Sequence, residues 1–220
     1  MRFQQRLKRL LDVTAAMLAL LLLAPLLAAV ALAVYLAMGR PVLFRQPRAG
    51  LRGKVFTLYK FRTMSDARDN QGRLLPDDCR VTGVGRFLRS TSLDELPELI
   101  NVLRGEMSLV GPRPLLPQYL GRYTPEQARR HEVRPGLTGL AQVKGRLLLG
   151  WEERFLLDVW YVDHATLAMD LKILLVTVWK VLRREGTTAI SEEVLVEFQG
   201  TARREPLPLA ENRLLERSSL

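Results

Sequence analysis

The chain has 220 residues, which is enough for one compact domain with a membrane element and too few for two full domains. Its 33 Lys and Arg residues outnumber 23 Asp and Glu residues, and the formal net charge of +10 indicates an anionic partner such as nucleic acid, anionic lipid or a phosphorylated substrate. A single cysteine excludes an intramolecular disulfide, and two histidines far apart in sequence argue against a structural zinc site.

An uncharged apolar segment runs from Val13 to Met38, long enough for a helix to cross a bilayer core of about 30 Å. A secretory signal peptide is disfavoured because its apolar region is usually only about 7–15 residues long. Both flanks are basic and favour the cytoplasmic side, which a single span cannot satisfy. Pro25 lies near the middle and should bend or break the helix. A single span and a re-entrant hairpin both stay open, because spanning helices also contain proline kinks.

Three charged residues, Lys8, Arg9 and Asp12, precede the apolar segment. Arg9 and Asp12 are three positions apart, so they can pair on one helical face at the membrane interface. One interpretation is that these three side chains simply extend toward water. The other is that they, together with the bend at Pro25, anchor the chain at the lipid headgroups.

The remainder of the chain predicts short strands among helices. We expect strands at 42–44, 54–61 and 107–110, and turns at 50–53 and 134–136. We expect helices at 80–90, 96–103, 124–132, 151–163 and 165–185, the last of them amphipathic. The chain therefore divides into a membrane-anchoring segment (1–39), a cytosolic or interfacial domain (40–185) and a partly disordered tail (186–220).

Two adjacent carboxylates, Asp94 and Glu95, stand at the start of one predicted helix. Ser92 and Glu95 have the spacing of a capping box, so a purely structural role explains them on spacing alone. Pro97 belongs in the first turn of a helix, which moves the expected start to Leu93 or Asp94. Both acids would then lie on an exposed lip, where backbone N–H groups can also bind an anion.

Several basic residues are candidates for binding phosphate. Pro112 and a second proline flank Arg113, and a stiff backbone suits an arginine that makes a bidentate phosphate contact. Lys60 and Arg62 are two apart on a predicted strand, so they should share a face, and Arg89 adds further charge. A solvated turn and an exposed basic strand explain the same residues without a ligand.

A third candidate is the glycine-bearing stretch from 134 to 146. Its glycines permit close approach of the backbone to a ligand. Gln142 and Arg146 could read a base or hold a phosphate. Glycine loops are common, so this stretch is a weak signal by itself.

These segments together resemble the small monotopic phosphoglycosyl transferases, the bacterial sugar transferase family, and in particular its PglC-type members. The resemblance extends from about Lys8 to about Glu185. The motifs that carry it are Lys8-Arg9 with Asp12, Tyr59-Lys60-Phe61-Arg62-Thr63-Met64, Ser92-Leu93-Asp94-Glu95-Leu96, Asn101-Val102-Leu103, the 111–114 and 134–139 loops, and Asp158-Val159-Trp160-Tyr161. The resemblance implies an α+β fold: an N-terminal re-entrant membrane helix-break-helix, and a small, mostly helical cytosolic domain with short strands and interfacial amphipathic helices.

The resemblance also implies a reaction. Asp94 would attack the β-phosphate of a UDP-sugar and release UMP, and polyprenyl (undecaprenyl) phosphate would then accept the phospho-sugar. Asp94 would lie near a Mg²⁺ ion, and Glu95 would act as a base or orient the nucleophile. The expected place is the cytoplasmic face of the bacterial inner membrane, in contact with membrane lipid and without nucleic acid. A homodimer is compatible with this picture.

The sequence departs from the family's pattern at a few positions. Ala24 precedes Pro25 where members have serine, and Lys144 stands where members often have asparagine. Residues 147–149 are three leucines and more apolar than usual, so the sugar preference stays open. Two rival interpretations are a non-catalytic, membrane-anchored basic scaffold that binds anionic lipid, and a Mg²⁺-dependent phosphatase that forms an aspartyl phosphate.

Overall fold

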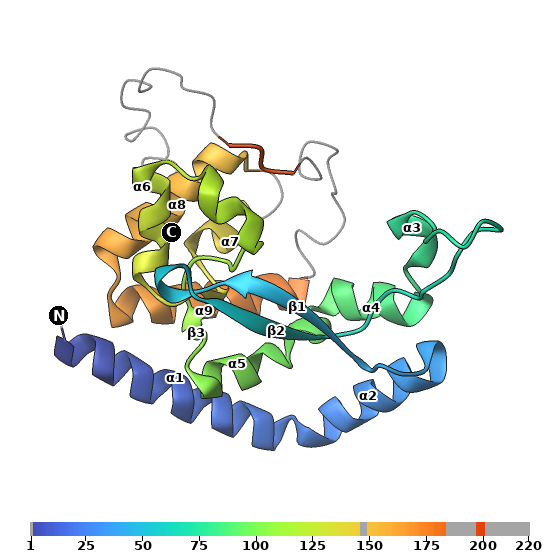
Figure 1. The fold of residues 1–220 in the computed structure, drawn as a ribbon. Helices are drawn as coiled ribbons and strands as arrows, with labels where there is room; N and C mark the ends of the chain where they lie inside the picture. Colours follow the sequence, from blue (N-terminus) through green and yellow to red (C-terminus); the bar gives the residue numbers. More distant parts are fainter. Residues whose placement is uncertain (1, 146–148, 184–196, 201–220) are drawn as a thin grey trace.

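A computed structural model describes residues 2–145, 149–183 and 197–200. Its N-terminal part is a bent pair of helices, α1 (Arg2–Leu22) and α2 (Ala24–Met38), which forms the base on which the rest of the molecule lies (Figure 1). No single helix within these ranges combines the length and the apolar character needed to cross a bilayer. The two helices meet this requirement only together, with a bend of 64° between them.

The bend lies beside Pro25, where the sequence predicts it. Leu23 leaves the helical conformation with φ −90° and ψ 2°, and α2 then starts with the proline in its first turn. Because proline has no N–H, the carbonyl oxygen of Leu21 loses its helical donor and the chain changes direction there.

Charged residues of α1 fasten this helix to the domain above it. The buried carboxylate of Asp12 accepts hydrogen bonds from the Ser108 hydroxyl (2.7 Å) and from the Leu109 amide (3.2 Å). Lys8 donates to the carboxylate of Asp170 at 2.7 Å. These partners come from distant parts of the sequence, so α1 is held in one orientation relative to the domain.

Arg9 also binds the domain. Its guanidinium donates to the carbonyl oxygens of Val102 (2.7 Å) and Leu103 (3.1 Å), in the last turn of α5 (Glu98–Arg104). A cation there satisfies carbonyl groups that lack helical partners. The expected pairing of Arg9 with Asp12 is therefore replaced by contacts with the domain, and the salt bridge of Asp12 within α1 is with Lys8 at 3.9 Å.

The first sheet is an antiparallel hairpin that leads from the bent helices α1 and α2 to the domain. Strand β1 (Leu43–Ala49) pairs with β2 (Val55–Phe61) through the short 3₁₀ turn η1 (Leu51–Gly53). The second strand is confirmed, and the first is longer than the predicted 42–44. The observed strand includes Pro47; β1 has only one neighbouring strand in the described sheet, and proline is tolerated at such an edge.

The second sheet is a short parallel pair, β3 (Ser108–Val110) with β4 (Gly136–Thr138). The prediction of a simple turn at 134–136 is wrong, because this stretch enters a strand. A Cβ on Gly136 would lie 2.1 Å from the Gly111 amide nitrogen, so the two backbones meet where only glycine fits. Gly111 and Gly136 therefore allow two segments of the protein's own backbone to approach each other closely.

The helices cover both sheets (Figure 1). Besides α1, α2 and α5, the α-helices of the described chain are α3 (Asp77–Arg80), α4 (Gly83–Thr91), α6 (Pro125–Ala128), α7 (Leu140–Lys144), α8 (Trp151–His164) and α9 (Leu167–Arg183). The predicted helix at 80–90 thus divides between α3 and α4. The predicted helix at 124–132 starts with a capping box between Thr124 and Gln127 and ends as the 3₁₀ turn η4 (Arg129–Glu132).

The core is shared between the domain and the bent helices α1 and α2. Ala16 of α1 is fully buried against a cluster from β2, α5 and the start of β3. A second cluster joins β3 to α7, α8 and α9. The members of the first cluster are Ala16, Phe56, Leu58, Leu99, Val102 and Met107. Because α1 supplies part of this core, the domain and its base form one packed unit.

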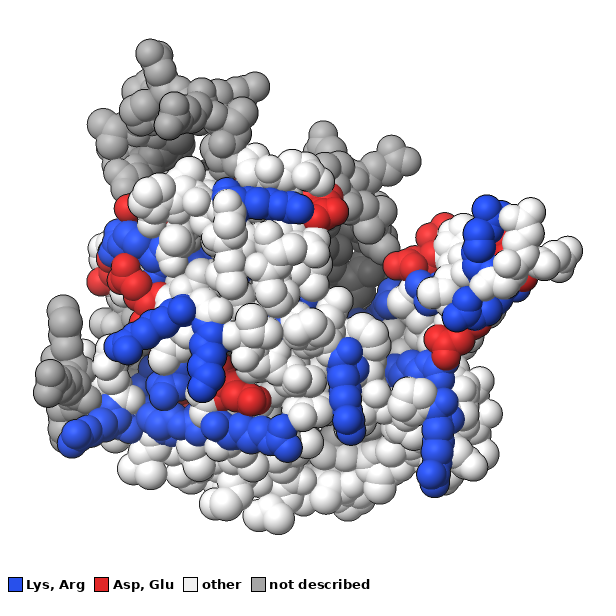
Figure 2. Space-filling model, in the orientation of Figure 1, with Lys and Arg blue, Asp and Glu red and all other residues white. Residues whose placement is uncertain are grey.

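Large apolar side chains remain exposed on α1, α2 and α9. Examples are Leu22 (79% exposed), Leu36 (75%) and Leu182 (78%). In Figure 2 the lower surface, formed by α1 and α2, is free of charge beneath a row of Lys and Arg. Exposed apolar surface of this extent marks contact with a membrane or a partner. The amphipathic helix expected at 165–185 is confirmed as α9, with Asp170 and Ile173 buried on its inner side.

Replacing Asp12 tests how firmly α1 is fixed. Asp12→Ala leaves the buried Ser108 hydroxyl and the Leu109 amide without their acceptor, which should lower the free energy of unfolding by about 2 kcal/mol. Thermal unfolding in detergent should show the loss, whereas Gln5→Ala, at an exposed position of the same helix, should change little. Equal melting temperatures for the two variants would show that α1 is not held by this carboxylate.

Candidate active site

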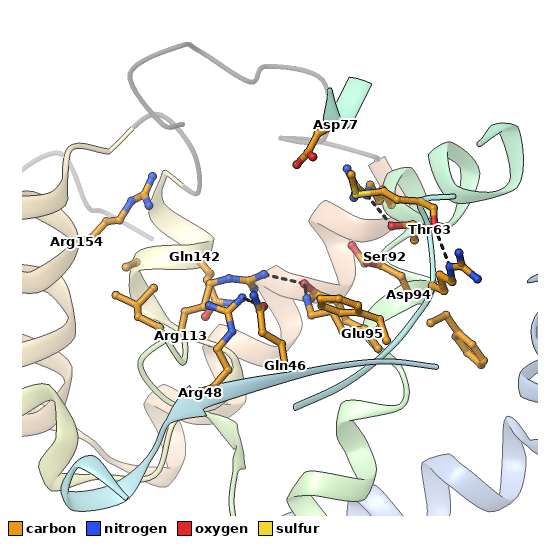
Figure 3. A pocket seen from close by; sticks show the side chains of 18 of the residues that line it. Gln46, Arg48, Thr63, Asp77, Ser92, Asp94, Glu95, Arg113, Gln142 and Arg154 are labelled. Carbon is orange, nitrogen blue, oxygen red and sulfur yellow. Dashed lines mark hydrogen bonds and ion pairs between the residues drawn. The ribbon is translucent and has the colours of Figure 1, made fainter. Parts of the chain in front are cut away.

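A cleft of about 750 Å³ opens between the β1–β2 hairpin, the chain from α4 to η2 (Leu93–Glu95), and helices α7 and α8 (Figure 3). Its volume is in the range of small-molecule sites. Most of the residues singled out in the sequence as catalytic or phosphate-binding line this one cleft. They are Lys60, Arg62, Arg89, Asp94, Glu95, Arg113 and Gln142.

The two carboxylates lie on the connection between α4 and α5. Helix α4 ends at Thr91, Ser92 adopts a left-handed conformation with φ +56°, and the 3₁₀ turn η2 follows. The α-helix starts only at Glu98, later than the predicted start at Leu93 or Asp94, because Pro97 acts as its N-cap residue. The dyad therefore lies on a tight turn between two helices, at the edge of the cleft.

Glu95 is paired with two cations of the cleft. One of its oxygens, Oε1, lies 2.7 Å from Lys60 Nζ on β2 and 2.9 Å from Arg113 Nη2 on the 111–114 loop (Figure 3). Burial opposes ionisation, but the two cations outweigh it and hold the pKa of Glu95 far below its ordinary value. Glu95 is therefore a charged, weakly basic group.

Asp94 has the opposite environment. Within the described residues its carboxylate makes no hydrogen bond or ion pair, although it is half-buried and lines the cleft. Burial, followed by the neighbouring charge of Glu95, raises its pKa above the ordinary value. The two adjacent carboxyl groups thus differ. The charge of Glu95 is balanced by two cations, whereas the carboxylate of Asp94 is left available for chemistry.

A third carboxyl group, Glu98, lies behind the dyad and is almost fully buried. Burial raises its pKa to about 7, while Lys60 at 3.1 Å favours the charged form. The Lys60 ammonium lies within ion-pair distance but is not aligned for a hydrogen bond to this oxygen. Lys60 is therefore committed mainly to Glu95.

The loop that carries Arg113 is fixed through its backbone. The Arg113 carbonyl accepts a hydrogen bond from Arg130 Nη2 at 2.8 Å, and the guanidinium of Arg130 is itself bound to the buried Asp158 at 2.7 Å. The Pro112 carbonyl accepts from the Gly136 amide at 3.0 Å. Pro112 is not among the residues that line the cleft, so its contribution is to the shape of the loop.

Arg62 and Arg89 line the cleft but also have partners in the protein. Arg62 donates to the carbonyl oxygens of Met64 (3.0 Å) and Met38 (3.2 Å), and it forms a salt bridge with Asp66. Arg89 donates to the Thr63 hydroxyl at 3.0 Å. Arg62 thus braces the connection from α2, and the expected joint action with Lys60 is replaced by separate contacts.

The third predicted stretch is only partly within the described chain. Gln142 of α7 lines the cleft and donates to the Leu137 carbonyl at 3.1 Å. Its buried Oε1 has no hydrogen-bond partner among the described residues, so it can accept from a ligand. Arg146 lies outside the described residues.

Four arginines of the cleft were not singled out in the sequence as site residues: Arg48, Arg80, Arg130 and Arg154. Arg48 of β1 and Arg154 of α8 both line it, and the Nε atom of each is buried without a hydrogen-bond partner in the described chain. Burial, and then the nearby charge of Arg113, lowers the pKa of Arg48 to about 10. Arg48, Arg113 and Arg154 thus bring three positive charges to the same cleft, which indicates a place for an anion. The only local sequence feature that points to Arg48 is its position two residues after Gln46, because two strand residues at this spacing share a face.

The acids of the cleft suit an open metal site. Across the described ranges, no three His, Cys, Asp or Glu side chains are grouped so that they could hold a metal ion. Mg²⁺ is usually bound by one or two carboxylates together with substrate phosphates and water, so it does not need a closed cage. Asp94 is the carboxylate suited to such an ion, because Glu95 is already bound by two cations.

Comparisons with known proteins agree with the geometry. The sequence model of the bacterial sugar transferase family matches residues 3–184. An uncharacterized sugar transferase, EpsL of Bacillus subtilis, is 54% identical over 195 residues, which are 89% of this chain and 96% of that protein. A UDP-glucose:undecaprenyl-phosphate glucose-1-phosphate transferase of Caulobacter vibrioides is 49% identical over 190 residues, which are 81% of this chain and 71% of that protein.

A third relative is longer. An undecaprenyl-phosphate galactose phosphotransferase of Salmonella typhimurium is 39% identical over 207 residues, which are 84% of this chain and only 42% of that protein. The similar part of that relative therefore corresponds to most of the present chain. Because the family model spans the bent helices and all the elements that build the cleft, this chain belongs to the bacterial sugar transferase family.

Proposed function

We propose that this protein transfers a sugar phosphate from a UDP-sugar to undecaprenyl phosphate, giving a polyprenyl diphosphate sugar and UMP. The observation that carries the proposal is the carboxylate of Asp94, which has no partner among the described residues and lies beside Glu95 in a cleft lined with arginine and lysine. The names of relatives support it, because they describe glucose-1-phosphate and galactose-phosphate transfer to undecaprenyl phosphate.

In the proposed first step, an Asp94 oxygen attacks the β-phosphorus of the donor. The bond from this phosphorus to the bridging oxygen breaks, and UMP leaves with that oxygen and its electron pair. In the second step, a phosphate oxygen of the lipid attacks the same phosphorus, and the Asp94 carboxylate is released. Asp94 is suited to this role because no cation of the described chain ties up its oxygens.

The cations would make the approach of two anions possible. Arg48, Arg113 and Arg154 line the cleft from three different elements, to one side of the turn that carries the dyad (Figure 3). A diphosphate held there would have its charge balanced in a partly dry site, where such contacts are stronger than in water. Bound Mg²⁺, held by Asp94 and substrate oxygens, would supply Lewis-acid neutralisation of the diphosphate.

Glu95 fits an orienting role better than that of a base. Its pKa is depressed by Arg113 and Lys60, so it has little tendency to take up a proton near neutral pH. Its charge keeps those two cations at the edge of the cleft, where they can also reach a phosphate. We therefore assign Glu95 to electrostatic positioning of the phosphate-binding cations.

We further propose that the bent helices α1 and α2 enter the membrane from the cytoplasmic face and return to it. Their exposed apolar side chains and the 64° bend support a shallow hairpin, and both basic flanks then stay on one side. The exposed apolar side chains of α9 would rest at the same interface. The cleft would thus lie at the depth where a lipid phosphate is found.

Asp94→Asn should abolish turnover, with a loss of at least about a thousandfold in kcat, because the amide cannot act as the nucleophile. UMP release from a panel of UDP-sugars with undecaprenyl phosphate measures the effect. Asp78→Asn, at an exposed site that does not line the cleft, is the control and should retain activity. Near-normal turnover by Asp94→Asn would exclude the covalent role.

The rate of the first step should depend on the ionisation of Asp94. Its pKa is raised by burial and by Glu95, so the reactive carboxylate is lost as the pH falls through a value above the ordinary aspartate range. Glu95→Gln removes the neighbouring charge and releases Lys60 and Arg113, and both changes lower the pKa of Asp94. The acid limb of single-turnover UMP release should therefore move to lower pH, and a limb that stays in place would contradict the assignment.

Labelling with an impermeant thiol reagent should test the hairpin. Native Cys79 is exposed on the domain, and Gln5→Cys in a Cys79→Ser background places a thiol at the exposed start of α1. In inverted membrane vesicles both thiols should react, and in intact spheroplasts neither should. Reaction of the two thiols from opposite sides would establish a single span.

A further inference from the structure

A short piece of the predicted tail returns to the domain. Residues 197–200 are described, and among them Phe198 is only 3% exposed, while Glu197 and Gln199 on either side are exposed. An aromatic side chain that is buried between two exposed neighbours acts as an anchor. The question is what this anchor holds in place.

Phe198 fills a pocket made of four other aromatic rings. Its ring centroid lies 5.0 Å from that of Phe155, 5.6 Å from Trp151, 5.7 Å from Tyr119 and 5.8 Å from Tyr123. Trp151 and Phe155 belong to α8, and Tyr119 belongs to the 3₁₀ turn η3 (Pro117–Arg122). We call these four rings the aromatic box. Phe198 packs against the two rings from α8 and against the two tyrosines.

Polar contacts define how the segment enters the aromatic box. Arg122 donates to the Glu197 carboxylate at 2.9 Å and also to the Phe198 carbonyl. The Gln118 amide donates to the same carboxylate. These contacts are largely exposed and contribute little stability, so they orient the segment while Phe198 supplies the burial.

The aromatic box adjoins the active-site cleft. Phe155 belongs to both, because its ring packs against Phe198 and also lines the cleft. The guanidinium of Arg130 lies 5.5 Å from the centre of the Phe155 ring. Arg130 in turn holds the Arg113 carbonyl at 2.8 Å, and Arg113 binds Glu95 at 2.9 Å. An unbroken series of contacts therefore runs from the tail to the dyad.

We propose that Phe198 is a positioning residue of the active site: by completing the aromatic box it holds Phe155 and Arg130, and through them Arg113, in place. The kinetic part of this proposal rests on the proposed function, whereas the structural part does not. Without Phe198, Phe155 loses its tightest ring contact, and the guanidinium that stacks on it loses a firm support. The loop with Arg113 would then sample other positions.

The kinetic test uses three variants of the full-length chain. Phe198→Ala removes the anchor, Phe198→Leu keeps much of its apolar volume, and Gln199→Ala changes an exposed neighbour in the same segment. Phe198→Ala should lower kcat/KM for the UDP-sugar by about threefold to thirtyfold, which is typical of coupling through packed networks. Phe198→Leu should recover most of the loss, and Gln199→Ala should match the unchanged protein.

Hydrogen exchange supplies a readout that does not need turnover. In Phe198→Ala, but not in Gln199→Ala, amide exchange should become faster in residues 111–116 as well as in the aromatic box. A purely structural anchor would speed exchange around 117–123 and 151–155 only, and leave kcat and KM of the folded enzyme unchanged. That result would overturn the proposal.

The two measurements separate the two proposals. If the unchanged protein releases no UMP from any UDP-sugar, the proposed function fails, and hydrogen exchange still decides whether Phe198 positions the 111–116 segment. If the unchanged protein is active and Phe198→Ala is equally active, the positioning role fails while the proposed function stands.

Discussion

One oxygen atom joins the parts of this active site. Glu95 Oε1 receives Lys60 from β2 and Arg113 from the loop after β3, and Glu95 itself lies on the turn between α4 and α5. Three segments that are distant in sequence are thereby fixed at one point. Because both cations prefer this oxygen, the adjacent Asp94 is left without a partner in the described chain, although it is also an acid in the same cleft. The difference between the two carboxyl groups follows from this arrangement.

The positive charge of the chain is distributed between structure and binding. A net charge of +10 indicates anionic partners, but several arginines of the cleft are already engaged by the protein. Arg130 is bound to Asp158, and Arg62 to carbonyl oxygens near the end of α2. Arg48 donates to the Pro114 carbonyl and to Gln46, yet its Nε, like that of Arg154, is buried and lacks a partner among the described residues. The arginines best suited to bind an anion are therefore those with a hydrogen-bond donor that lacks a partner. The total number of cations is less informative.

The bent helices α1 and α2 and the domain are parts of one structure. Asp12, Lys8 and Arg9 of α1 all bind groups of the domain, and Ala16 lies in its core. The orientation of the cleft is therefore coupled to that of the bent helices. For an enzyme whose proposed acceptor is anchored in lipid, this coupling would have a direct use, since in the proposed membrane arrangement it would set the height of Asp94 relative to the bilayer surface.

The sequence by itself determined the features that depend on neighbouring residues. Pro25 predicts the bend, Thr124 and Pro125 predict a capped helix, and the motif around Asp94 and Glu95 carries the resemblance to the family. Such features follow from backbone chemistry within one or two turns, or from a motif that can be read directly.

Only the tertiary structure decided the pairings between distant segments. The β3–β4 pair, the partners of Arg9 and Asp12, the arrival of Arg48 and Arg154 at one cleft, and the burial of Phe198 all join residues far apart in the chain. Local propensity carries no information about which distant group a side chain will meet. That choice is made by packing and by the need of each buried polar group for a partner.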